Sequence, residues 1–151
     1  MLLKTGLGFL IFLTSFIGII ANIIVLRPVF TLAKNPKKSS IYVISLFNIL
    51  ADIANLSLAS FYLAPCIILE SYLIGDWNEE GVPKFMGFLA LLIWYIINIT
   101  QIVMATNRYI VICYRNHKIF THRNIYILFL ITFIFSSAKA YIVQYLLPCC
   151  V

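Results

Sequence analysis

Long stretches without a charged residue alternate with short clusters of charges along the chain. Residues 5–26 contain no charged residue, and neither do residues 85–107. An apolar helix of about 20 residues crosses a bilayer core of about 30 Å, so each stretch is long enough to span a membrane. The pattern therefore predicts at least two transmembrane helices.

Two further apolar stretches each contain one charged residue. Residues 39–69 carry only Asp52, and residues 124–151 carry only Lys139. Transmembrane β-strands need about ten residues with alternating polarity, and these runs are longer and more evenly apolar. We predict an all-α, polytopic transmembrane helical bundle that forms a single domain over residues 1–151. Its four spans are placed at residues 5–26, 41–67, 85–114 and 124–147.

The composition supports this fold class and excludes others. Apolar residues make up 63% of the chain and charged residues 11%, against roughly 45–50% and 25% in soluble domains. A soluble enzyme domain and a disordered chain are both excluded by this balance. The sequence offers no candidate catalytic site, no metal-ligand cluster and no motif that requires a cofactor. We expect a multi-pass protein of the plasma or sensory-cell membrane whose first partner is the lipid bilayer.

The charges of the connecting loops predict the orientation of the chain. Residues 27–40 and residues 115–123 carry Lys and Arg with no acid, whereas residues 70–84 carry four acids and one Lys. Short basic loops stay on the cytoplasmic side. We therefore expect the N-terminus outside, the two basic loops inside and the C-terminus outside. The net charge of +6 is then a topology signal, and nucleic acid is not an expected partner.

Polar residues recur at helical spacing in the second span. Ser45, Asn48, Asp52 and Asn55 follow one another at intervals of three, four and three, which places them on one face of a helix. A carboxylate near the bilayer centre costs about 2.5–3.5 kcal/mol even on lenient scales. This face is therefore expected to turn inward, toward other helices.

The third span repeats the same spacing. Asn98, Gln101 and Arg108 share one face, and Asn22 of the first span could donate a hydrogen bond to Asp52. The predicted intramembrane polar network consists of Asn22, Asn48, Asp52, Asn55, Asn98 and Gln101. One interpretation is that it only holds the helices together through interhelical hydrogen bonds. For Asp52 and Arg108 a working site or switch is the favoured interpretation, because ionisable groups at depth usually mark function.

Three short strings stand at similar depths in three successive spans. They are Gly18 to Asn22, Leu50 to Asp52, and Asn107-Arg108-Tyr109. Together they resemble landmarks of helices one, two and three in rhodopsin-like G-protein-coupled receptors. The pair Trp94-Tyr95 and the string 118–121 make the chain similar to nematode chemoreceptors of the serpentine receptor class x.

The resemblance implies a G-protein-coupled chemosensory receptor. Such receptors have seven helices, so the four spans would correspond to helices one to four of a partial product. Asn107, Arg108 and Tyr109 would form the motif that couples to a heterotrimeric G protein if a full-length form exists. An unknown small-molecule or peptide ligand would enter between the outer helix ends, where Trp94 and Lys139 are candidate pocket residues. The alternative for Lys139 is a side chain that reaches toward the membrane interface.

The family's disulfide has no direct counterpart here, because Pro83 occupies the position of its first cysteine. Cys66 could pair with Cys149 or Cys150 in an oxidising compartment, and unpaired thiols are the other interpretation. A function from a different class also stays open. The chain could be a four-helix membrane accessory or scaffold protein whose polar residues serve packing alone.

Overall fold

The computed structural model describes residues 2–34, 41–69, 71, 81–113 and 120–146. The described residues form α1 (Leu2–Ala33), α2 (Ile41–Leu58), α3 (Ala64–Leu69), α4 (Gly81–Cys113) and α5 (His122–Tyr141), with single π-helical turns η1 (Ala59–Leu63) and η2 (Ile142–Leu146). Within this part of the chain, four helical segments are long and apolar enough to cross a membrane. The predicted all-α, membrane-spanning fold class is confirmed.

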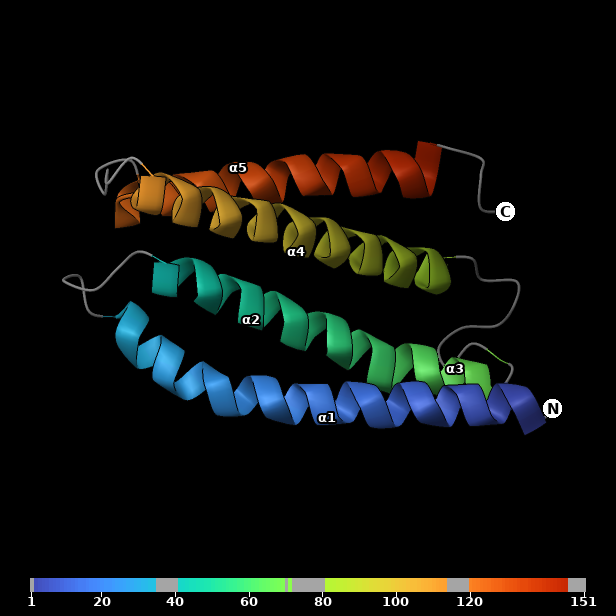
Figure 1. The fold of residues 1–151 in the computed structure, drawn as a ribbon. Coiled ribbons are helices and arrows are strands. Elements are labelled where there is room, and N and C mark those ends of the chain that lie inside the picture. Colours follow the sequence, from blue (N-terminus) through green and yellow to red (C-terminus); the bar gives the residue numbers. More distant parts are fainter. Residues whose placement is uncertain (1, 35–40, 70, 72–80, 114–119, 147–151) are drawn as a thin grey trace.

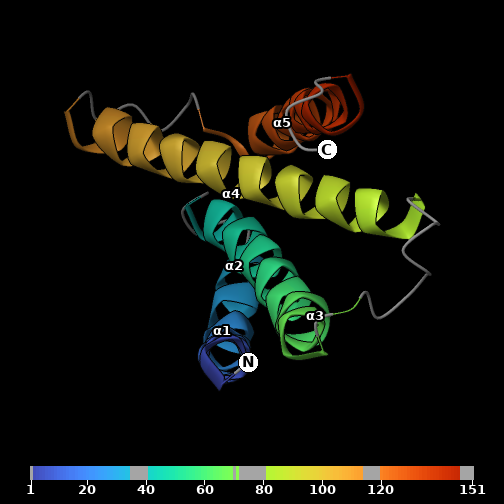
Figure 2. The same ribbon diagram turned by 90° about the vertical axis from the view of Figure 1, so that its right-hand side faces the viewer.

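The four segments pack in the order α1, α2, α4 and α5, α4 crosses the others at an angle (Figure 2), and α2 also meets α5 at one end. α1 packs against α2 and α3, α2 packs against α4, and α4 packs against α5. Figures 1 and 2 show this order, with successive segments running in opposite directions. This arrangement leaves much of each helix uncovered, and large apolar side chains such as Ile24 and Ile102 are about two-thirds exposed. Such a surface is suited to lipid as the solvent.

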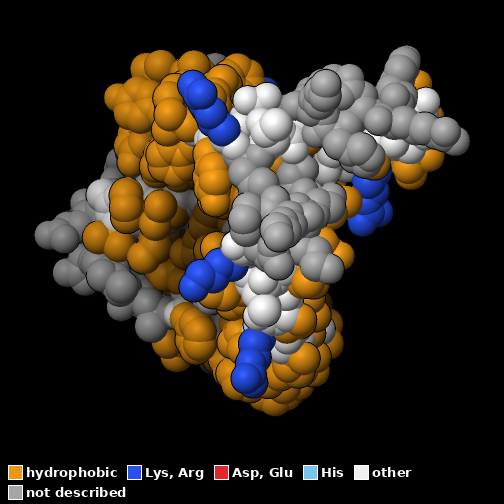
Figure 3. All heavy atoms as spheres, turned by 90° about the vertical axis from the view of Figure 1, so that its left-hand side faces the viewer, with side chains coloured by type: hydrophobic (Ala, Val, Ile, Leu, Met, Phe, Trp, Pro, Cys, Tyr) orange, Lys and Arg blue, Asp and Glu red, His pale blue; other side chains and the backbone are white. Residues whose placement is uncertain are grey.

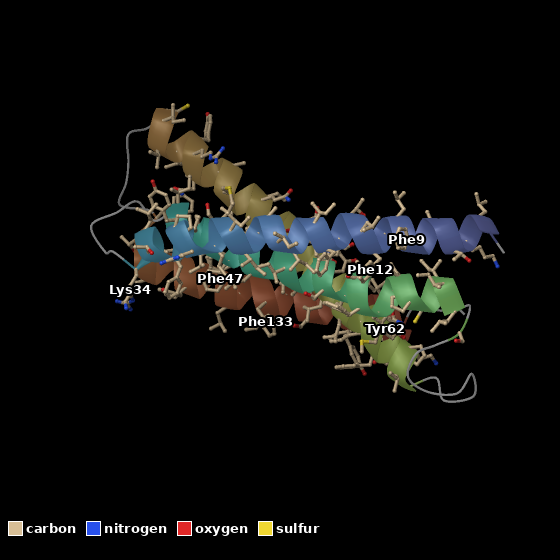
Figure 4. The ribbon with its side chains drawn as sticks, turned by 90° about the horizontal axis from the view of Figure 1, so that it is seen from below. Phe9, Phe12, Lys34, Phe47, Tyr62 and Phe133 are labelled. Carbon is tan, nitrogen blue, oxygen red and sulfur yellow. The ribbon has the colours of Figure 1, made fainter. Side chains whose placement is uncertain are left out.

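A small apolar core joins α2 to α5 close to the first residues of both helices. Val43 and Ile44 of α2 are buried together with Ile125 and Phe129 of α5. Phe47, labelled in Figure 4, stacks on Phe129 with ring centroids 4.1 Å apart, an arrangement worth about 0.5–1.5 kcal/mol beyond the buried area. This core lies where α2 and α5 begin, which is the end predicted to be cytoplasmic.

Two glycines let α1 lie close against the second span. A Cβ at Gly8 would stand 2.6 Å from Cγ1 of Ile68 and 3.1 Å from the carbonyl oxygen of Ala64. A Cβ at Gly18 would stand 3.0 Å from a methyl group of Leu56. Small residues allow this approach in membranes, where van der Waals packing drives helix association.

The second span contains a widened turn that the sequence pattern did not predict. In η1 the backbone N–H of Ala64 donates to the carbonyl of Ala59, five residues back. Pro65 follows directly. Proline has no N–H, and its ring clashes with the carbonyl four residues earlier, so a wider turn before it relieves the clash while the helix continues. α2, η1 and α3 thus form one continuous span, Ile41–Leu69.

The helix ends differ from the predicted span ends in two places. α1 continues past residue 26 to Ala33 and includes Arg27 and Pro28, so Arg27 belongs to a helix and not to a loop. The candidate span Leu3–Ala33 has 31 residues, about 46 Å of helix, which exceeds a hydrocarbon core of about 30 Å. α4 begins at Gly81 instead of residue 85, because Pro83 is tolerated in the first turn of a helix.

Candidate functional site

Asp52 lies within the second span and accepts a hydrogen bond from a residue of its own helix. Nδ2 of Asn48 donates to Oδ2 of Asp52 at 2.8 Å, one turn away on α2. Both side chains are half-buried, as is Asn55 on the same helix face. The predicted spacing thus brings Asn48 and Asp52 together, and Oδ1 of Asn48 is buried with no hydrogen-bond partner.

Several other polar side chains of the spans bond to their own helix backbone. Asn22, proposed as a donor to Asp52, instead donates from Nδ2 to the carbonyl of Gly18 at 2.9 Å. Ser57 donates to the carbonyl of Ile53 at 2.7 Å. Bonds of this kind pair a polar group within hydrocarbon without help from another helix. For these residues the expected interhelical bond is replaced by a local one.

The polar face of α4 points away from the packed helices. Asn98, Gln101 and Arg108 are all exposed, and Nδ2 of Asn98 donates to the carbonyl of Trp94 at 2.7 Å. The spacing does place the three side chains on one face. The expectation that this face turns toward the packed helices differs from the structure, in which α2 and α5 cover the other side of α4. We call the residues Trp94, Asn98, Gln101, Ala105 and Arg108 the open face of α4.

The side chains of the three residues in the predicted coupling motif point in different directions from α4. Asn107 is 1% exposed, and its Oδ1 has no hydrogen-bond partner. Arg108 and Tyr109 are exposed. Successive helical residues point about 100° apart, so a motif of three cannot face one way. Asn107 therefore lies in the packed interior of the described chain, while Arg108 and Tyr109 lie on its exposed surface.

A cation lies among aromatic rings where α4 meets α5. The ammonium group of Lys139 is 5.4 Å from the ring centroid of Tyr95 and 5.3 Å from that of Phe135. Tyr95 in turn meets Trp94 edge-on at 5.2 Å between centroids. The two candidate pocket residues, Trp94 and Lys139, are thus linked through Tyr95. Sequence reasoning had not included Phe135, although it stands one helical turn before Lys139.

Cationic side chains mark the opposite end of the molecule. Figure 3 looks onto the end at which α1 and α4 finish and α2 and α5 begin, and it shows separate Lys and Arg side chains on a largely apolar surface. Described cations toward this end include Arg27, Lys34, Arg108 and Arg123. Arg27, Lys34 and Arg123 belong to the basic segments from which the cytoplasmic side was predicted, and the orientation stays a prediction.

The cysteines are described only in part. Cys66 of α3 is half-buried and Cys113 of α4 is exposed, and both carry free thiols. Cys149 and Cys150, the predicted partners of Cys66, lie outside the described residues. Within the described part of the chain, no group of three or more His, Cys, Asp or Glu residues is placed to hold a metal ion.

The comparisons with known proteins identify the family. No curated protein and no solved structure matches the chain. A family model described as serpentine type seven-transmembrane G-protein-coupled chemoreceptor Srx matches residues 12–151. The match covers the first candidate span from residue 12 onward, all of the other three candidate spans and nearly the whole sequence. The chain therefore belongs to the serpentine seven-transmembrane chemoreceptors of class Srx.

Proposed function

We propose that this chain is a chemosensory receptor component with two working regions joined by α4. An external ligand binds in the outer half of the span, where Lys139, Tyr95 and Trp94 lie close together. A heterotrimeric G protein binds at the cytoplasmic end, where Arg108 and Tyr109 are exposed. The observation that carries this proposal is the open face of α4, which runs without interruption from Trp94 to Arg108, about 21 Å along the helix.

The open face supports the receptor reading on energetic grounds. Amide groups such as those of Asn98 and Gln101 find no water in hydrocarbon, and an unpaired polar group there costs several kcal/mol. Asn98 relieves part of this cost through its bond to Trp94. Further membrane-spanning segments packed on this face would supply the remaining partners. The family is a seven-transmembrane one, and the described residues provide four candidate spans.

Signalling requires that the further membrane-spanning segments on the open face of α4 have two alternative arrangements. A ligand in the outer half shifts the equilibrium only by the difference in its affinity for the two arrangements. Movement of these segments would then expose or shield Arg108, whose side chain has no carboxylate beside it in sequence because Asn107 precedes it. Asp52, held by Asn48, is an ionisable group between the two regions that both arrangements must accommodate.

The G-protein arm can be tested on the chain as it exists. The purified chain is reconstituted in lipid nanodiscs, and binding of a nucleotide-free heterotrimeric G protein is measured. We expect binding that Arg108→Ala abolishes and that Arg123→Ala, at the same end on α5, preserves. Both arginines are exposed, so neither substitution leaves a cavity in a core.

The same measurement separates the receptor from the accessory or scaffold alternative. A scaffold that uses its polar residues for packing would show no G-protein binding, or binding that both arginine variants weaken alike. Asn22, Ser57 and Asn98 all bond to their own helix backbone, so these bonds do not join two helices as the alternative requires. Equal behaviour of the two variants would replace the receptor proposal with this one.

A further inference from the structure

We propose that Lys139, Phe135 and Tyr95 form a binding site for the carboxylate of a single-chain amphiphile that enters sideways from the lipid. This inference rests on the ligand-binding part of the proposed function and names the chemical class of its ligand. Trp94 borders the site through its edge contact with Tyr95. The argument depends on the charge, the depth and the apolar surroundings of Lys139.

Aromatic rings, and no acidic side chain among the described residues, lie beside the ammonium group of Lys139. Its ammonium group lies 5.4 Å from the ring of Tyr95 and 5.3 Å from that of Phe135. Asp52 is the one acidic residue among those that the structure describes, and its carboxylate accepts from Asn48 on α2. A cation–π contact attracts a cation without neutralising it, so the site keeps a positive charge for an anion.

The depth of Lys139 makes this charge costly without a ligand. Lys139 stands seven residues before Leu146, where the described helix ends, which is about 10 Å along the axis. Insertion of a lysine into a span is unfavourable, most at the centre and less near the ends. Cation–π contacts recover only part of this cost. A carboxylate brought to the ammonium group would offset the rest.

The surroundings of Lys139 suit an aliphatic tail. Ile131, Phe135, Lys139 and Ile142 are spaced by four, four and three, so they share one side of α5. The three apolar residues are exposed by 62%, 54% and 46%. A tail lying over Ile131 and Phe135 points toward the middle of the membrane while its carboxylate meets Lys139. The headgroup of a bilayer lipid stays at the interface and does not reach this depth.

The form of the cation also favours a carboxylate. An ammonium group carries one charge and balances one carboxylate, whereas a phosphate monoester carries a charge of about −1.5 to −2 and is commonly met by several cations. Lys139 has aromatic rings as its neighbours at the site. One carboxylate matches one ammonium group, and the rings leave room for the hydrocarbon that follows it.

The experiment uses the full chain in nanodiscs of zwitterionic phosphatidylcholine, with empty nanodiscs as the background. Binding of radiolabelled dodecanoate is measured, and dodecanol serves as an uncharged competitor of the same length. We expect saturable binding of dodecanoate that dodecanol does not displace. Lys139→Gln should weaken it about tenfold, which corresponds to loss of one charge-assisted hydrogen bond.

Lys139→Arg should retain binding, and Arg123→Gln, which removes a cation at the other end of α5, should leave it unchanged. Thermal unfolding of each variant shows that the fold is kept. Equal binding by Lys139→Gln and the parent chain, or displacement by dodecanol, would overturn the proposal. Displacement by phosphatidylglycerol in the nanodisc would also overturn it and assign the site to a lipid headgroup. None of these outcomes affects the Arg108-dependent binding of G protein, which tests the other part of the function.

Discussion

Asn48 and Asp52 form a hydrogen bond of 2.8 Å along one side of α2. The donor and the acceptor are one turn apart, so the helix itself fixes their geometry, and no second helix is needed. The bond also uses only one half of the Asn48 amide, since its Oδ1 is buried without a partner. The carboxyl group of Asp52 is thereby paired within its own helix, while the Asn48 amide keeps an unused acceptor.

The first prediction concerns this pair. Asn48→Leu leaves the half-buried carboxylate of Asp52 without its donor, and we expect the free energy of unfolding to fall by about 1–3 kcal/mol. Replacing both residues with Leu should cost less than Asn48→Leu alone, because no polar group then stays unpaired. Unfolding in mixed micelles, analysed as a double-mutant cycle, measures the coupling. Purely additive losses would mean that the bond contributes nothing.

The second prediction concerns the approach of α1 to the second span. Gly8→Ala places a methyl group against Ile68 and against the backbone oxygen of Ala64. The backbone atom cannot turn aside, so α1 must move, and we expect a loss of about 1–3 kcal/mol in the free energy of unfolding. Gly18→Ala meets only the side chain of Leu56, which can change rotamer, and should cost less.

Gly6 provides the matched control for these two variants. A Cβ at Gly6 has no atom within 4 Å, and alanine is a better helix former than glycine by about 1 kcal/mol. Gly6→Ala should therefore be neutral or stabilising in the same unfolding assay. If Gly8→Ala behaved like Gly6→Ala, the close packing of α1 on α3 would have to be abandoned.

The spacing of polar residues allowed the shared faces to be predicted, but not the direction of each face. Asn98, Gln101 and Arg108 do lie on one side of α4, as a period of 3.6 requires. Periodicity fixes only the angles between residues of one helix. The rotation of α4 against its neighbours depends on packing, and here Thr100 and Asn107 are buried while the polar side chains of the open face are exposed. Because the prediction considered only the polar face of this span, it did not show that Asn107 is the buried residue of the coupling motif Asn107-Arg108-Tyr109.

The helix ends show a second limit of sequence reasoning. Thr121 starts α5 as its N-cap, with Oγ1 accepting from the backbone N–H of Asn124 at 3.4 Å. Threonine before an apolar run is a recognised start signal, but our sequence analysis used this residue only within a family-like string. The π-helical turn before Pro65 had a weaker signal, since a proline within a span permits a kink, a break or a widened turn.

The third prediction concerns Asn107. Its side chain is 1% exposed, and Oδ1 has no partner, so Asn107→Asp buries a charge that the outward-pointing Arg108 does not reach. We expect this variant to lower the free energy of unfolding by at least about 1–3 kcal/mol. Asn107→Leu has nearly the same volume and removes the unpaired oxygen, so it should be neutral or stabilising.

The same site separates folding from signalling. In a full-length homologue, an acid before the arginine should lower basal signalling if it restrains the arginine. Burial of Asn107 in the present chain opposes that effect, because the carboxylate would first have to leave the packed interior. Basal signalling and unfolding are therefore measured on the same Asn107→Asp protein. A stable variant with reduced basal signalling would show that the carboxylate at position 107 reaches Arg108. It would also show that residue 107 is not buried when the receptor is in its non-signalling state.

The last prediction concerns orientation. Cys66 lies in α3, at the end of the molecule where α1 begins, and Cys113 ends α4 at the opposite end (Figure 1). The basic loops predict that Cys113 is cytoplasmic and that Cys66 lies toward the outside. Single-cysteine proteins are made on a background with serine at positions 149 and 150. A membrane-impermeant maleimide added to intact cells should leave Cys113 unlabelled until the cells are permeabilised. Labelling of Cys113 in intact cells would reverse the topology, and it would place Arg108 where no G protein could reach it.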